Sequence, residues 1–118
     1  MLRDRLNEIA ARIGSFGALA LVGPDGIAVE AVRADEAVDV DMLCAELVSL
    51  VRAMEENHRE LPFGALRGLD ITAERCRVTI HGLAGGFWLL LVMPAGEPVG
   101  RARFELRRSP LFLADELI

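Results

Sequence analysis

Lysine is absent from this chain of 118 residues, and all 13 basic residues are Arg. A P-loop lysine, a pyridoxal-phosphate Schiff base and a catalytic lysine are therefore excluded. The two cysteines, Cys44 and Cys76, are too few for a metal-site pattern or a disulfide scaffold. The sequence thus predicts neither a metal site nor a cofactor site.

The chain also lacks a block of like charges and an apolar run of membrane-spanning length. The net charge is −5 and is spread along the chain, which argues against non-specific binding to nucleic acid. The longest apolar run, residues 87–93, is too short for a membrane span, so we expect no direct membrane insertion. Mixed charges at residues 1–6 with no apolar stretch after them do not suit a signal peptide. We expect a cytoplasmic protein.

The same apolar run suits a central strand covered on both faces, because such a strand need not alternate polar and apolar residues. The chain has the length of one domain, spanning 1–118. Its patterns predict a helix, two strands, a helix, three strands and a helix, at residues 2–13, 17–22, 27–32, 39–58, 66–72, 76–82, 87–93 and from 99 onward.

This order of elements predicts an α+β domain with a mixed or mostly antiparallel sheet and helices on its faces. The strands near Ile27 and Leu66 are polar enough to be edge strands. Ser109-Pro110 resembles a new N-cap followed by proline at the first helical position. We therefore expect a kink, or a second short helix, near Pro110.

The middle helix has more apolar surface than docking on one sheet requires. We expect its main stripe to face the sheet, with Cys44 and Val48 widening the apolar arc to roughly 160°. That arc is covered either by loops of the same chain or by a second subunit. We favour a subunit interface, because so small a chain has few spare elements to cover it. The main stripe consists of Leu43, Leu47, Leu50, Val51 and Met54.

No pattern of catalytic residues emerges, so we expect no enzyme. Cys76 and His81 lie five positions apart on one strand, which points their side chains to opposite faces. The glycine-rich segment 82–86 opens a strand rather than a helix, so no phosphate-binding helix terminus follows it. The arginines of the last helix suit a solvated face, although Arg103 and Arg107, spaced i, i+4, leave a minor anion-binding role open.

The hairpin 17–27, the middle helix and above all the segment from Phe87 to Arg108 resemble the roadblock/dynein light-chain superfamily. Within it the chain is most similar to the bacterial gliding regulators of the MglB-like branch. The resemblance covers nearly the whole chain. Its most specific part is the last strand, followed by a glycine and by Val-Gly-Arg-Ala-Arg at 99–103, where the last helix begins. Pro110 departs from the family pattern, in which the final helix usually continues.

The resemblance implies a five-stranded antiparallel sheet in the order 2-1-5-4-3. The middle helix would lie on one face and the terminal helices on the other. It also implies a homodimer in which the third strand and the middle helix meet their symmetry mates. Together with the wide apolar arc, this gives the predicted dimer interface: Cys44, Val48, Leu69 and Ile71.

Family members are not enzymes themselves but scaffold or regulate Ras-like small GTPases, some of them accelerating GTP hydrolysis. The resemblance therefore implies a GTPase partner of the MglA type. The polar arc of two paired middle helices is the predicted partner surface: Glu46, Ser49, Arg52, Ala53, Glu56 and Asn57. A small-ligand sensory domain and a purely structural dimerisation module remain as alternative functions.

Overall fold

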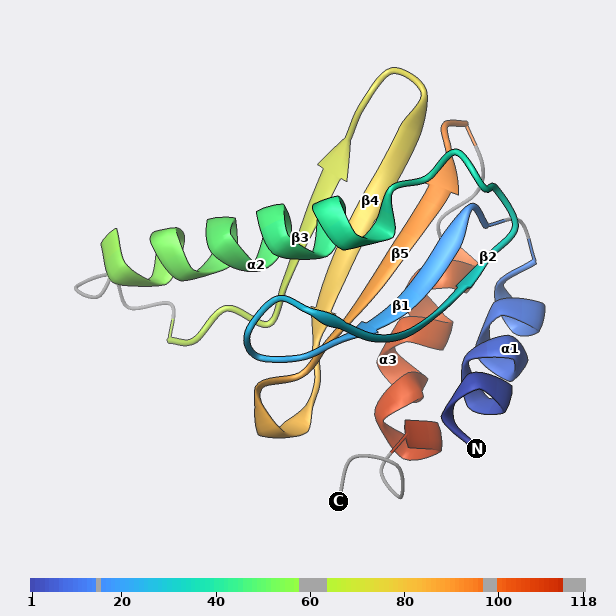
Figure 1. Ribbon diagram of the computed structural model, residues 1–118, viewed down its shortest axis with the longest axis horizontal. Helices are drawn as coiled ribbons and strands as arrows, with labels where there is room; N and C mark the ends of the chain where they lie inside the picture. The colour runs from blue at the N-terminus through green and yellow to red at the C-terminus, as the bar shows by residue number, and fades with distance from the viewer. Residues whose placement is uncertain (15, 58–63, 97–99, 114–118) are drawn as a thin grey trace.

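The computed structural model describes residues 1–14, 16–57, 64–96 and 100–113, and Figure 1 shows their arrangement. The described elements follow the predicted order, and their described ends differ from the expected ones by two residues at most. One addition is a short 3₁₀ turn before the last strand. The elements are α1 (Leu2–Ile13), β1 (Ala18–Val22), β2 (Ala28–Arg33), α2 (Val40–Asn57), β3 (Gly68–Thr72), β4 (Cys76–Gly82), η1 (Ala84–Gly86), β5 (Trp88–Pro94) and α3 (Gly100–Leu113).

The five strands form one antiparallel sheet in the order β2-β1-β5-β4-β3, which confirms the expected topology. The apolar strand β5 lies in the centre, between β1 and β4. Its residues Leu89 to Met93 are all buried, because both of its faces are covered. The more polar strands β2 and β3 lie at the two edges, as predicted.

Helices cover the two faces of the sheet unequally. The long helix α2 crosses one face, and α1 and α3 pack side by side on the other (Figure 1). Alternate residues of β5 divide between two cores, with Leu90 and Val92 on the α2 side and Leu89 and Leu91 on the side of α1 and α3. The molecule therefore has three layers, with the sheet in the middle.

The turn between β1 and β2 has the predicted hairpin chemistry. Asp25 Oδ1 accepts a hydrogen bond from the backbone N–H of Ile27 at 3.1 Å, and Gly26 has φ +84°. A Cβ at Gly26 would lie 3.4 Å from Cβ of Val48, so the turn packs directly against α2. The hairpin therefore packs against one flank of α2.

The expected second short helix at Pro110 is wrong, because α3 continues as one helix to Leu113. Proline lacks the N–H that would bond to the carbonyl of Leu106, but Pro110 lies in the last turns of α3, where few helical bonds follow it. The segment from residue 114 and His58, the expected last residue of the middle helix, lie outside the described residues.

Candidate functional site

Five buried residues attach α2 to the sheet. Cys44 is completely buried and Val48 is 2% exposed, and both pack against the core formed by β1, β4 and β5. The structure thus places these two predicted interface residues inside the monomer core, where little of either is left for a second copy. The sequence analysis therefore predicted the wrong orientation of α2 about its own axis, because it placed Leu50 rather than Val48 against the sheet. The five residues are Val40, Cys44, Leu47, Val48 and Val51.

The rotation of α2 turns part of the expected sheet-facing stripe towards solvent. Leu50 is 43% exposed, and Leu43 and Met54 are half-buried. At i, i+7 and i+11, these three residues form one line along a flank of the helix. This apolar flank lies about 180° around the helix from Arg52, which is on the flank that carries the β1–β2 turn.

The edge strand β3 contributes a second apolar strip. Leu69 and Ile71 are half-buried and pack against the same core as Leu43, while the backbone of β3 pairs with β4 on one side only. Figure 1 shows α2 extending across β3 and beyond the edge of the sheet. We call Leu43, Leu50, Met54, Leu69 and Ile71 the α2–β3 surface.

The predicted partner surface lies on the outward side of α2. Arg52 has an additional contact, since its guanidinium donates a hydrogen bond to the carbonyl oxygen of Pro24 in the β1–β2 turn. This contact gives Arg52 a structural role that the sequence did not indicate. The side chain of Asn57 lies outside the described residues. The exposed members are Glu46, Ser49, Arg52, Ala53 and Glu56.

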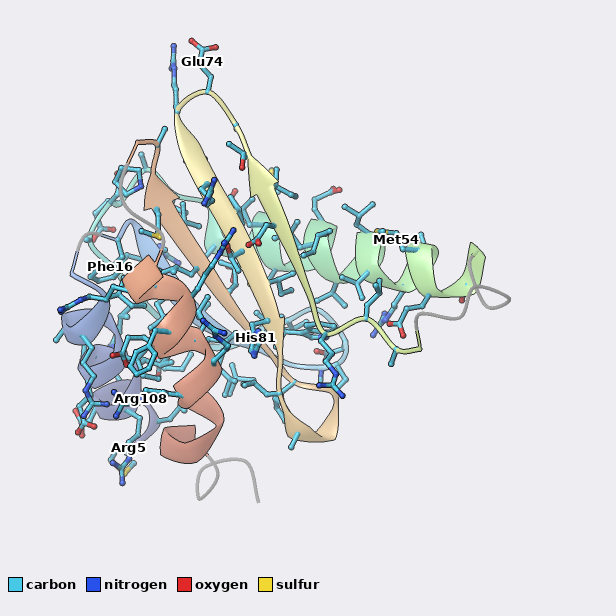
Figure 2. All side chains as sticks on the ribbon, turned by 180° about the vertical axis from the view of Figure 1, so that it is seen from behind. Arg5, Phe16, Met54, Glu74, His81 and Arg108 are labelled. Atoms are coloured by element: carbon cyan, nitrogen blue, oxygen red, sulfur yellow. The ribbon has the colours of Figure 1, made fainter. Side chains whose placement is uncertain are left out.

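The thiols and the described imidazole do not form a nucleophile–base pair. Cys76 packs on the α2 side of the sheet, and His81 lies on the side of α3 (Figure 2). Burial, with a smaller contribution from Asp41, raises the pKa of Cys44 to about 11, which keeps this thiol protonated. In the described ranges, no three His, Cys, Asp or Glu side chains gather as metal ligands.

A cleft that contains charged side chains opens between β3, β4 and α3, where sequence analysis favoured only a solvated helix face. Its volume is about 380 Å³. Asp70 accepts a hydrogen bond from Thr79 Oγ1 at 2.6 Å and forms an ion pair with Arg103 at 3.7 Å. Burial and the charge of Arg107 lower the pKa of His81, and Asp70 opposes them. The i, i+4 spacing of the two arginines was the only sequence signal for this cleft.

None of the helices in the described part of the chain is both long and apolar enough to cross a membrane. No family model matches the chain, and no curated protein matches it either.

Solved structures of similar fold do exist. MglB of Myxococcus xanthus has a TM-score of 0.85 at 10% identity, covering 98% of this chain and 94% of its own. An MglB described as having a tetrameric arrangement has a TM-score of 0.84 at 17% identity, covering 98% of this chain and 88% of its own. A roadblock/LC7 domain from Streptomyces avermitilis has a TM-score of 0.84 at 12% identity, covering 98% and 96%. The chain has the roadblock/LC7 fold of the MglB type.

Proposed function

We propose that this protein is a homodimeric regulator or scaffold that binds a Ras-like small GTPase of the MglA type. The observation that carries the proposal is the α2–β3 surface, which combines an exposed apolar helix flank with a strand edge that has no neighbour in the described part of the sheet. Figure 1 shows α2 crossing over β3. The MglB-type fold supports it, as does the tetrameric arrangement of one MglB of the same fold. The family resemblance of the sequence supplies the GTPase as the partner.

In the proposed dimer the two β3 edges pair antiparallel, and the two α2 helices pack side by side across a two-fold axis. Such a contact is self-complementary, since each copy offers both the same edge and the same flank. Leu50 is the most exposed leucine of the α2–β3 surface, and its burial removes apolar area from water at about 25 cal/mol per Å². Cys44 and Val48 support this interface from within each monomer.

The GTPase would bind to the outward faces of the paired α2 helices. Glu46, Ser49, Ala53 and Glu56 are exposed there and are turned away from the sheet. A single GTPase lying across the two-fold axis gives one GTPase per dimer. The mixture of charged and small side chains suits a rim that sets association rate and salt dependence.

The proposed regulator contributes no catalytic residue to GTP hydrolysis. Cys44 is buried with a raised pKa, and Cys76 and His81 lie on opposite faces of the sheet. In this account it acts by binding the switch regions of the GTPase and holding the residues of the GTPase itself in place. Acceleration of hydrolysis is then an effect of positioning.

Titration calorimetry with the GTPase in its GTP-analogue state tests the proposal. The double substitution Ala53→Arg with Glu56→Arg adds bulk and reverses charge on the outward face, and should weaken binding at least tenfold while light scattering still shows the dimer. We leave Arg52 unchanged, because its contact with Pro24 stabilises the fold. Glu74→Arg is the matched control, since Figure 2 places Glu74 at the tip of the β3–β4 hairpin, away from α2.

Undiminished affinity in the double variant would remove the partner site from α2. Absence of GTPase binding by the wild-type dimer would instead favour a structural dimerisation module.

A further inference from the structure

We propose that the cleft between β3, β4 and α3 binds a small organic phosphate, with its phosphate group held by Arg103, Arg107 and His81. This inference is independent of the GTPase partner. The cleft is lined by residues of β3, β4 and α3. Since α3 lies on the opposite face of the sheet from α2 (Figure 1), a second copy packed along α2 in the proposed dimer would leave the cleft open.

The cleft exists because the second layer of helices does not reach the edge of the sheet. Helix α1 packs on α3, β1 and β2, which leaves the same face of β3 uncovered. Gly68 is paired with His81 across the strands and has no side chain to cover it. A Cβ at this position would lie 3.0 Å from the carbonyl oxygen of Ile80. The floor beside His81 is therefore open backbone.

Positive charge gathers at this cleft in an otherwise acidic protein. Three arginines, Arg67, Arg103 and Arg107, lie around His81, and Asp70 is the one carboxylate among the described residues that line the cleft and the hollow beside it. Arg107 donates through Nε to the carbonyl oxygen of Arg103 at 3.4 Å, and no carboxylate among the described residues lies within 4.0 Å of its guanidinium. A guanidinium placed in this way is suited to a phosphate, which it binds through two parallel N–H donors.

A second hollow beside the cleft offers room for an organic part of the proposed ligand. It has a volume of about 730 Å³ and shares His81 and Arg107 with the cleft. The half-buried side chains of Leu66 and Leu83 line it, beside Arg67. Small-molecule sites combine apolar walls with a few polar groups that fix the orientation of the ligand. An anion with no organic part would leave these apolar walls unused.

Asp70 and His81 both interact electrostatically with an anion that enters the cleft. Asp70 orients Arg103 by their ion pair, but its charge also opposes an incoming anion. The charged groups that face His81 are Asp70 and Arg67 from the β3 segment and Arg103 and Arg107 from α3. A bound phosphate near the imidazole would favour its protonated form and raise its pKa.

Phenyl phosphate is a suitable probe, in calorimetry and in NMR titrations of the His81 ring protons on the full chain. We expect it to bind at least tenfold more tightly than inorganic phosphate and to raise the pKa of His81. Arg107→Gln should weaken binding at least tenfold, whereas Asp70→Asn should tighten it several-fold. Arg75→Gln, an exposed arginine on the β3–β4 turn, is the matched control and should change neither.

Three results would overturn the proposal. The first is equal affinity for inorganic phosphate, which would mean an unspecific anion site. The second is an equal loss of affinity in Arg75→Gln, which would mean a diffuse attraction of anions to arginine. The third is binding to phosphatidylglycerol vesicles with no binding of phenyl phosphate, which would mean a lipid headgroup surface. Circular dichroism of each variant verifies that the fold is retained.

Discussion

His81 shows how neighbouring charges act on one side chain in the cleft. Its pKa is lowered by burial and by Arg107, and is raised by Asp70. Removing each charge in turn should therefore move the pKa in opposite directions. Arg107→Gln should raise the pKa of His81, and Asp70→Asn should lower it, each in ligand-free protein.

NMR titration of the His81 ring measures both shifts, with Arg75→Gln as a control that should leave the pKa in place. A pKa that moves in the same direction in both variants would show that the imidazole does not lie between these charges.

Cys44 is buried, whereas the other cysteine, Cys76, is partly exposed to solvent. With a pKa of about 11 it is ionised to only about one part in a thousand at pH 8 in the folded protein. In a Cys76→Ser variant, which leaves one thiol, we expect a disulfide reagent at pH 8 to label the native protein far more slowly than the chain unfolded in guanidinium. Equal labelling rates would contradict the burial of Cys44.

The raised pKa of Cys44 also makes stability depend on pH. The unfolded thiol ionises near pH 9 and the folded one near pH 11. Above pH 9 the unfolded chain therefore binds fewer protons than the folded one, so the free energy of unfolding falls as pH rises from 9 towards 11. Denaturant unfolding should show this fall, and a Cys44→Ala variant should show less of it.

At the scale of elements, the helices and strands follow from the apolar pattern and from the turn residues. The run at residues 87–93 identified the central strand, and Pro24-Asp25-Gly26 identified the first hairpin. The second short helix expected at Pro110 does not form, because a Ser-Pro pair can lie within a continuing helix as well as at a helix start.

The orientation of α2 could not be predicted from its own sequence. Its apolar arc includes both Cys44 and Leu50, and either edge of that arc suits a sheet. The deciding contact comes from elsewhere, because the β1–β2 turn packs on Val48 through Gly26 and fixes which side is buried. The cleft beside α3 was missed for a similar reason, since Asp70, His81 and Arg107 belong to three separate elements.

The orientation of α2 leads to a prediction with two matched variants. Val48→Glu puts a charge into the core on the sheet and should unfold the protein, because such a buried charge costs several kcal/mol. Leu50→Glu puts the same charge on the exposed flank and should leave the fold intact but give a monomer. Circular dichroism and light scattering together distinguish the two outcomes.

A folded Val48→Glu protein, or an unfolded Leu50→Glu protein, would show that the opposite side of α2 faces the sheet. A folded and fully dimeric Leu50→Glu protein would place the dimer contact away from this flank.

At the scale of the whole molecule, the two proposed interfaces and the cleft occupy separate surfaces. In the proposed assembly the α2–β3 surface joins two copies and the outward face of α2 binds the GTPase. The cleft is lined by residues of α3, which lies on the opposite face of the sheet from α2 (Figure 1). A dimer formed through β3 joins two five-stranded sheets into one sheet of ten strands. Edge pairing of this kind also covers a strand that otherwise invites aggregation.

The proposed dimer links stability to concentration. Association stabilises the folded state by mass action, so the melting temperature of the wild type should rise with protein concentration. The Leu50→Glu monomer should lack this dependence.

In the proposed assembly, two copies pair through the α2–β3 surface. Sedimentation equilibrium of the wild type and of Leu50→Glu, both at tens of micromolar, tests it most directly. We expect about twice the chain mass of 12.9 kDa for the wild type and the single chain mass for the variant. A wild-type protein that sediments as a single species of 12.9 kDa would rule out the proposed dimer.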